Sequence, residues 1–251
     1  MNYTLRNVKI KSSWFDLDGK FKKMKAEGLH LYLSLFKFRL HNQSFEHYFL
    51  TSIKLLRQET GFTKKQILDL LKLQQKLKVI NIQNVTRWDR FLDSEGRIPD
   101  NHILQITATD IPELNEVTKG TGQTIQQPMT DDDFYISLEF ALLELYIEKG
   151  LNYKYFPLLC LMKKLQNGNV EKKAYMTIKK MADHLGYDKD YVNKLVHQMN
   201  KAYVLFSHYR KNCKDGHYFE HHLLQSVKEQ EKFLRNFKNE IDKNISTRMR
   251  L

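Results

Sequence analysis

The feature that most constrains the fold of this chain is a single glycine, Gly186, between two segments with helical spacing of apolar residues. From Ile178 to Leu185 apolar residues recur at intervals of three and four, which predicts a short helix with one buried stripe. Gly186 supplies the left-handed conformation that ends such a helix, and Asp188 is a good N-cap for the next. The second helix has its own stripe, at Val192, Leu195, Val196 and Met199. The spacing therefore predicts a helix-turn-helix.

The segments on either side extend this prediction to a whole domain. VLFSHYR and HYFEHHLL are β-rich and flank the turn KNCKDG, which predicts an antiparallel hairpin. Upstream, FPLLCLMKKLQNG has the pattern of a supporting helix, with Pro157 acceptable in its first turn. A hairpin directly after the second helix of a helix-turn-helix is the layout of a winged helix. We therefore predict a winged helix-turn-helix domain over residues 132–225.

The N-terminal part repeats this plan when the sequence is shifted by 125 positions, so that Gly61 falls on Gly186. Thr63 then falls on Asp188, and the buried stripe is matched by Ile67, Leu70 and Leu71. The first helix of this copy would be GLHLYLSLFKFRL, and its wing would run through NVTRWDRFLDSEGR to the strand HILQITAT. We predict a second winged helix-turn-helix domain over residues 1–110.

Two positions disagree with the repeat. Arg57 stands where Ala182 packs, and Gln74 stands where Met199 packs. The first copy is therefore either irregular or shifted by one residue.

Two further segments complete the predicted architecture. Residues 111–131 hold two prolines and two glycines among Thr and Gln, which predicts a loop or linker. Residues 226–251 have apolar residues at steps of seven, which predicts an amphipathic helix. That helix either packs on its own domain or pairs with a second subunit in a homodimer; lying on a membrane is the weakest alternative. The fold class is α+β: mainly α, with small β-hairpins.

The charge of the chain indicates its partners. The formal net charge is +12 and the isoelectric point is near 9.4, which favours a polyanion, either nucleic acid or an anionic membrane surface. No apolar run reaches the roughly 18 residues that a membrane-spanning helix needs, and the first residues are not of signal-peptide type. Cys160 and Cys213 form no CxxC pair and are expected to be reduced thiols. We expect a cytoplasmic, nucleoid-associated protein.

In a winged helix the third helix enters the major groove of double-stranded DNA. The outward face of the second copy would carry Lys189, Asp190, Asn193, Lys194, His197 and Lys201, and that of the first copy Lys64, Lys65, Gln66, Lys72 and Lys76. An ammonium group reaches guanine acceptors or phosphate, and a carboxamide pairs with adenine. Asp190 either accepts a hydrogen bond from the amino group of cytosine or stabilises the start of its own helix, and we favour the second interpretation. A single charged residue on an outward helix face is usually only solvated. The prediction of DNA binding therefore rests on the cluster of such residues on each helix and not on any one of them.

The wings carry cations as well. Arg210, Lys211 and Lys214 lie in the second wing, and Arg87, Arg90 and Arg97 in the first. Arginine there suits phosphates or a narrow minor groove, although ordinary solvated loops are an equal alternative.

Metal and catalytic chemistry is not expected. The second hairpin holds several residues of the types that bind zinc, but it lacks a paired-cysteine spacing. The simpler interpretation is that these are partly exposed hairpin residues without a metal, namely His208, Cys213, His217, His221 and His222. The acids Asp131, Asp132 and Asp133 precede the apolar segment FYISLEFALLELYIEKG, where acids stabilise a helix start. Phosphate-loop, GxSxG and HExxH motifs are missing from the sequence. We therefore expect no enzyme, no cofactor and no metal.

The entry segment IKSSWFDLDGKFKKMKAEGLHLYLSLFKFRL, followed by a helix-turn-helix, resembles the winged-helix replication initiators and replisome organisers of plasmids and phages. In that family an aromatic-containing strand precedes the first helix, and two-domain members carry a second winged helix after a linker. The resemblance implies binding to repeated origin sites, local duplex opening and recruitment of host replication proteins. It implies a recognition role for Lys189, Asn193 and Lys194, and in the first copy for Lys64 and Lys65.

Two other functions fit the same residues. A transcriptional regulator of winged-helix type would use identical contacts to DNA. A protein-interaction scaffold would use the same domains to bind protein partners.

Overall fold

The structure is a computed structural model of the 251-residue chain. It describes residues 7–39, 47–118, 124–130, 134–167, 173–210 and 218–246. Within these residues the chain forms an α+β fold with small antiparallel sheets, which confirms the predicted fold class at this level.

The first unit follows the order helix, strand, helix, helix, strand, strand. Its elements are α1 (Phe21–Leu35), β2 (Tyr48–Thr51), α2 (Ile53–Thr60), α3 (Lys64–Lys76), β3 (Ile80–Ile82) and β4 (Leu104–Ala108). The strands make an antiparallel sheet in the order β2-β4-β3. The short helix η2 (Phe36–Phe38) continues α1.

The second unit has the same order of elements. They are α5 (Phe156–Gln166), β8 (Lys173–Met176), α6 (Ile178–Leu185), α7 (Lys189–Lys201), β9 (Leu205–Arg210) and β10 (Tyr218–Leu223). Its sheet order, β8-β10-β9, is that of the first unit. The predicted hairpin after the second helix is present in this unit, and the strand before that helix pair was not predicted.

The elements of the two copies match residue by residue. Each of β2, α2 and α3 begins and ends 125 positions before β8, α6 and α7. The first copy is therefore irregular at two positions and not shifted. Gln74 is fully buried and its Nε2 donates to the Gly28 carbonyl at 2.8 Å, whereas Arg57 lies at the surface with Nη1 3.2 Å from Asp100 Oδ2.

The same local interactions bound the helices of both copies. Gly61 and Gly186 end α2 and α6 with φ of 73° and 61°. Thr63 forms a capping box with Gln66 at the start of α3, and the Asp188 carboxylate accepts from two amides at the start of α7. Capping and a left-handed glycine depend on neighbouring residues alone, which is why the sequence predicts them well.

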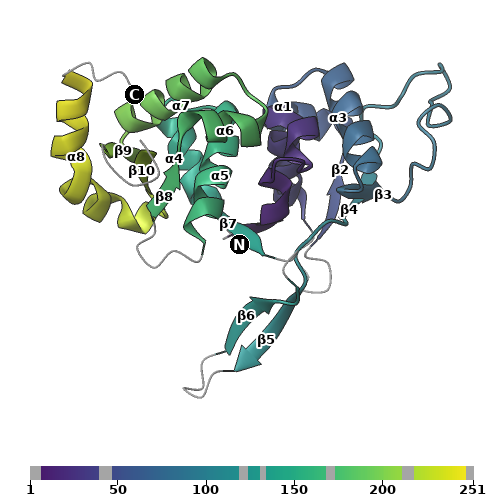
Figure 1. The fold of residues 1–251 in the computed structure, drawn as a ribbon. Coiled ribbons are helices and arrows are strands. Elements are labelled where there is room, and N and C mark those ends of the chain that lie inside the picture. Colours follow the sequence, from purple (N-terminus) through teal and green to yellow (C-terminus); the bar gives the residue numbers. More distant parts are fainter. Residues whose placement is uncertain are drawn as a thin grey trace.

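The two units are joined into one body rather than held on a flexible tether (Figure 1). Strand β1 (Asn7–Lys11) pairs antiparallel with β7 (Tyr135–Glu139), from Asn7 opposite Glu139 to Lys11 opposite Tyr135. The turn η1 (Ser12–Phe15) follows β1 and inserts Trp14 and Phe15 into the core. Buried residues of both units belong to one continuous cluster.

Helix α1 lies against both units. It packs on α2 and α3 of its own unit and on α5 and α6 of the other. Polar contacts accompany this packing: His184 Nδ1 lies 2.8 Å from the Phe15 carbonyl oxygen, and Lys164 forms an ion pair with Asp16. The relative position of the units is therefore set by apolar packing and by hydrogen bonds.

Residues 111–131 are not a plain loop in their described part. Strands β5 (Leu114–Thr118) and β6 (Thr124–Pro128) pair antiparallel and project from the body (Figure 1). The expected loop is a hairpin in this part, because composition marks a connection but does not show whether its backbone groups pair across a turn. The apolar helix expected from residue 134 is also shorter than predicted, since Tyr135–Glu139 is strand β7 and the helix α4 spans Phe140–Glu148.

The amphipathic C-terminal helix is present as α8 (Gln230–Ser246), after the short helix η6 (Val227–Glu229). Its apolar face packs on its own unit: Phe233 and Ile241 are buried, and the rings of Phe237 and Phe206 stack with centroids 5.0 Å apart. Of the three uses considered for this face, packing within the chain is the one observed. No helix in the described part of the chain is long and apolar enough to cross a membrane.

Candidate nucleic-acid interface

The outward face of α7 is open to solvent. Lys189, Asp190, Lys194 and Lys201 are exposed, and His197 is half-buried. Burial, followed by the nearby Lys201, lowers the pKa of His197. The Asp190 amide donates to Asp188 Oδ1, so Asp188 is the cap and Asp190 stands in the first helical turn. An acid there favours the helix start, in line with the favoured interpretation of Asp190.

Asn193 is less available for contact with a DNA base than the sequence suggested. It is half-buried at the edge of this face, and its Oδ1 atom is covered without a hydrogen-bond partner in the described residues. Pairing with adenine in two bonds needs both the donor and the acceptor of the carboxamide. That role would therefore require the side chain to move.

The corresponding face of α3 is partly committed to contacts within its own unit. Lys64 Nζ contacts the Ile98 carbonyl and Asp100 Oδ1, at 2.5 Å and 2.6 Å. Gln66 belongs to the capping box, and Lys72 Nζ lies 6.0 Å from the centre of the Trp88 ring. Lys65 and Lys76 are exposed and make no ion pair with any described residue. These two lysines are the freest cations on α3.

The segment predicted as the first wing, residues 84–97, keeps two of its arginines near acids. Arg87 Nη2 lies 2.6 Å from Asp89 Oδ2, and Arg97 forms ion pairs with Asp93 and Glu95. Arg90 is exposed. Surface ion pairs of this kind are weak, so Arg87 and Arg97 remain able to exchange a carboxylate for a phosphate.

The segment predicted as the second wing lies largely outside the described residues. Arg210 is the last residue of β9, and Lys211 and Lys214 follow in the part that is not described. Cys213, His217 and the acids Asp131, Asp132 and Asp133 also lie outside it.

The described histidines of the second hairpin make contacts within the protein. His221 is fully buried, its Nδ1 lies 2.9 Å from Ser207 Oγ, and burial lowers its pKa to about 4. His222 Nε2 lies 2.7 Å from Glu220 Oε1, and His208 is half-buried. Within the described ranges no group of three or more His, Cys, Asp or Glu residues is placed to hold a metal ion.

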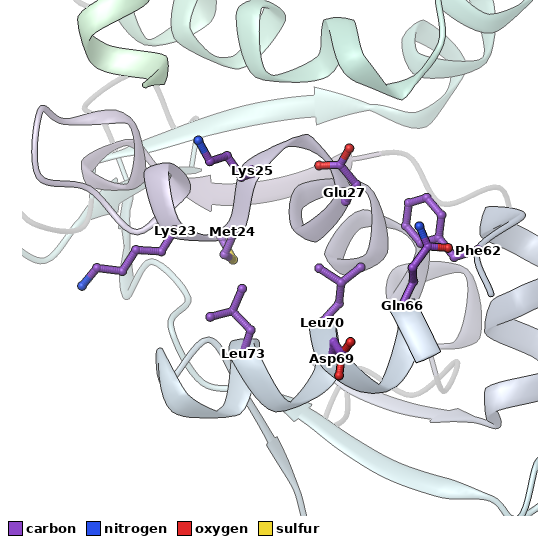
Figure 2. A pocket seen from close by; sticks show the side chains of 9 residues that line it. All are labelled: Lys23, Met24, Lys25, Glu27, Phe62, Gln66, Asp69, Leu70 and Leu73. Atoms are coloured by element: carbon purple, nitrogen blue, oxygen red, sulfur yellow. The ribbon is translucent and has the colours of Figure 1, made fainter. Parts of the chain in front are cut away.

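A groove runs between α1 and α3, beside the outward face of α3 (Figure 2). Its volume is about 280 Å³. Met24 faces Leu70 and Leu73 across it, while charged and polar groups stand at its rim, namely Lys23, Lys25, Glu27, Gln66 and Asp69. The backbone of α1 departs from helical geometry at Lys25, with φ of 59° and ψ of −174°. This conformation is costly for a residue with a side chain.

Both candidate helices begin next to α1. Phe62, just before α3, contacts His30 of α1 with ring centroids 5.6 Å apart. Tyr187, just before α7, contacts Phe21 of α1 at 6.1 Å and Tyr191 at 5.4 Å. The sequence prediction missed these aromatic residues, although their positions beside the two helix caps were a usable signal.

The chain is therefore an α+β protein with two similar units, and each unit presents exposed lysines on an equivalent helix. Comparison of the chain with protein families, with curated proteins and with solved structures gave no match.

Proposed function

We propose that the two units are winged-helix domains and that the protein binds double-stranded DNA in a sequence-specific manner. One observation carries the proposal: equivalent helices, 125 residues apart in register, each present exposed lysines at the position that contacts bases in a winged helix. The net charge of +12 supports a polyanionic partner.

In the proposed complex α7 lies in one major groove, with Lys189, Lys194 and Lys201 toward base edges and phosphates. Helix α3 lies in a second groove, with Lys65 and Lys76 as its main contacts. Equivalent sites on one face of DNA are about 34 Å apart, or a multiple of that distance. Because the units form one body, the two sites would have a fixed separation.

The proposed biological role is initiation of plasmid or phage DNA replication. It is supported by the resemblance of residues 10–40 to the entry segment of replication initiators. A strand, β1, does precede α1, although the aromatic residues of this segment, Trp14 and Phe15, lie after the strand in η1. Host replication proteins would be the further partners. Regulation of transcription is the alternative role for the same contacts.

The experiment is enrichment of genomic DNA fragments by the purified full chain, followed by affinity measurements on the fragments recovered. Clustered repeats near an origin support initiation, and single sites over promoters support regulation. If six to ten phosphates are contacted, affinity falls roughly 10³- to 10⁵-fold between 50 and 200 mM salt. Binding of protein partners without measurable DNA binding would contradict the proposal and favour an interaction scaffold.

A further inference from the structure

Four tyrosines gather where the two units meet. Tyr153 and Tyr155 belong to the short helix η5 (Tyr153–Tyr155), and Tyr187 and Tyr191 stand at the start of α7. The Tyr153 ring stacks on His30 at 4.7 Å and meets Phe62 edge-on at 5.5 Å. All four tyrosines are half-buried. Tyr153 therefore packs on α1 and the start of α3, Tyr187 packs on Phe21 of α1, and Tyr191 packs on Tyr187, while part of each side chain reaches solvent.

The hydroxyl groups of three of these tyrosines are unused. Within the described part of the chain, the hydroxyls of Tyr153, Tyr155 and Tyr191 make no hydrogen bond to another group. In contrast, the Tyr203 hydroxyl donates to Asp242 Oδ1 at 2.6 Å. A tyrosine with a packed ring and a free hydroxyl is an amphipathic recognition group, because ordering it on binding costs little conformational entropy.

The cluster lies between the two candidate DNA-binding helices. Gln66 of α3 and Tyr191 of α7 are equivalent in the repeat, being 125 positions apart, and both stand on the flank of their helix that faces α1. In Figure 1, α1 lies between α3 and the α6–α7 pair. DNA that contacted both helices would therefore pass over the cluster.

The charge around the cluster is mixed, with lysines in excess. Lys22 and Lys25 lie beside Gly186, next to Tyr187, and Lys154 and Lys189 adjoin the cluster in the chain. The acids there are Glu27, which is close to Tyr153 and Tyr191, and Asp188 and Asp190, which adjoin Tyr187 and Tyr191 in the chain. Burial, and then Glu27, raises the pKa of Tyr153, and burial raises that of Tyr155. These phenols therefore stay protonated near neutral pH and can donate.

We propose that this tyrosine cluster is a third DNA contact, at which the hydroxyls of Tyr153, Tyr155 and Tyr191 donate hydrogen bonds to phosphates of the backbone between the two grooves. The inference rests on the proposed function, since it takes double-stranded DNA as the ligand. Such contacts carry no base information, so they position the protein on DNA and hold the spacing of its two sites.

The test is the triple variant Tyr153→Phe, Tyr155→Phe and Tyr191→Phe, which removes three hydroxyls and keeps the rings. With the DNA fragment that wild-type protein binds best, affinity should fall roughly 10- to 100-fold, and by the same factor on random DNA. The matched control is Tyr135→Phe, on β7 below the helices, which should bind as wild type.

A backbone footprint provides a second measurement on the same complexes. Wild-type protein should protect the backbone sugars between the two sites from hydroxyl radicals, and the triple variant should leave that stretch exposed to cleavage while protecting both flanks. Equal affinity and an unchanged footprint in the triple variant would overturn the inference and leave the proposed function standing. Failure of wild-type protein to bind any DNA would instead overturn the proposed function.

Discussion

His30 and Tyr153 stack face to face, with ring centroids 4.7 Å apart and planes 5° from parallel. His30 belongs to α1 in the first unit, whereas Tyr153 precedes α5 in the second. The same imidazole contacts Phe62 just before α3, so one side chain links the second unit to the start of α3. Burial, and then Lys37, lowers the pKa of His30 to about 4, which keeps the ring neutral inside this contact.

Stability should depend on pH through His30 and His221, whose pKa values are both lowered to about 4. A histidine in the unfolded chain titrates near pH 6.5, so below that pH the unfolded state binds protons that the folded state does not. This contribution is complete above about pH 6.5 and is lost as pH falls toward 4. Each histidine should lower the free energy of unfolding by about 2 kcal/mol between pH 7 and pH 5. Urea unfolding at pH 7 and at pH 5 measures this change in the free energy of unfolding.

The control for this pH prediction is His221→Gln. The variant should lose about 2 kcal/mol less than wild type over the same pH interval, whatever its stability at pH 7. An identical loss in both proteins would show that His221 is not the titrating group.

Replacing Gly61 at the end of α2, or Gly186 at the end of α6, by alanine should destabilise the protein, and the two losses should differ. Gly61 and Gly186 both have positive φ, which costs a residue with a Cβ roughly 1–2 kcal/mol. A Cβ at Gly61 would meet no atom within 4 Å, whereas one at Gly186 would lie 3.3 Å from Lys22 Cγ of the first unit. Gly186→Ala should therefore lose more stability in thermal unfolding than Gly61→Ala. The reverse order would contradict the observed contact between α1 and the α6–α7 turn.

Gln74 should tolerate the residue that the other copy carries. It is fully buried, its Nε2 donates to the Gly28 carbonyl, and its Oε1 has no partner in the described structure. Gln74→Met keeps the volume and removes that unpaired oxygen, so its free energy of unfolding should stay within about 1.5 kcal/mol of wild type. Gln74→Ala leaves a cavity and should cost roughly 2–3 kcal/mol. Comparable losses in the two variants would argue that the hydrogen bond, and not packing, makes this site stable.

Lys194 should contribute to DNA sequence discrimination. It is exposed on α7 and makes no ion pair with any described residue. Lys194→Ala should reduce the difference in binding free energy between cognate and random DNA by about 1–3 kcal/mol. Lys232→Ala, which removes another exposed lysine, from α8, is the control and should change neither affinity by more than a few fold. Equal losses on both DNAs would place Lys194 on a phosphate instead of a base edge.

The sequence alone determined the parts of this fold that depend on neighbouring residues. The caps at Thr63 and Asp188, the left-handed Gly61 and Gly186, and the stripes of α6 and α7 were all predicted correctly. The shift of 125 residues was also correct, because every element from β2 to α3 recurs at that interval. A helix boundary is set within one or two turns of chain, so such features are visible without knowledge of the rest of the molecule.

How these parts combine depends on contacts between distant segments, which the sequence does not show. Strands β2 and β8 have four residues each and were missed, because a short apolar run becomes a strand only when a distant partner, here β4 or β10, pairs with it. The pairing of β1 with β7, the packing of α8 on its own unit and the tyrosine cluster likewise join residues far apart in the chain. Pairing and packing between distant segments depend on the arrangement of the whole core. The periodicity of apolar residues within one segment does not predict that arrangement.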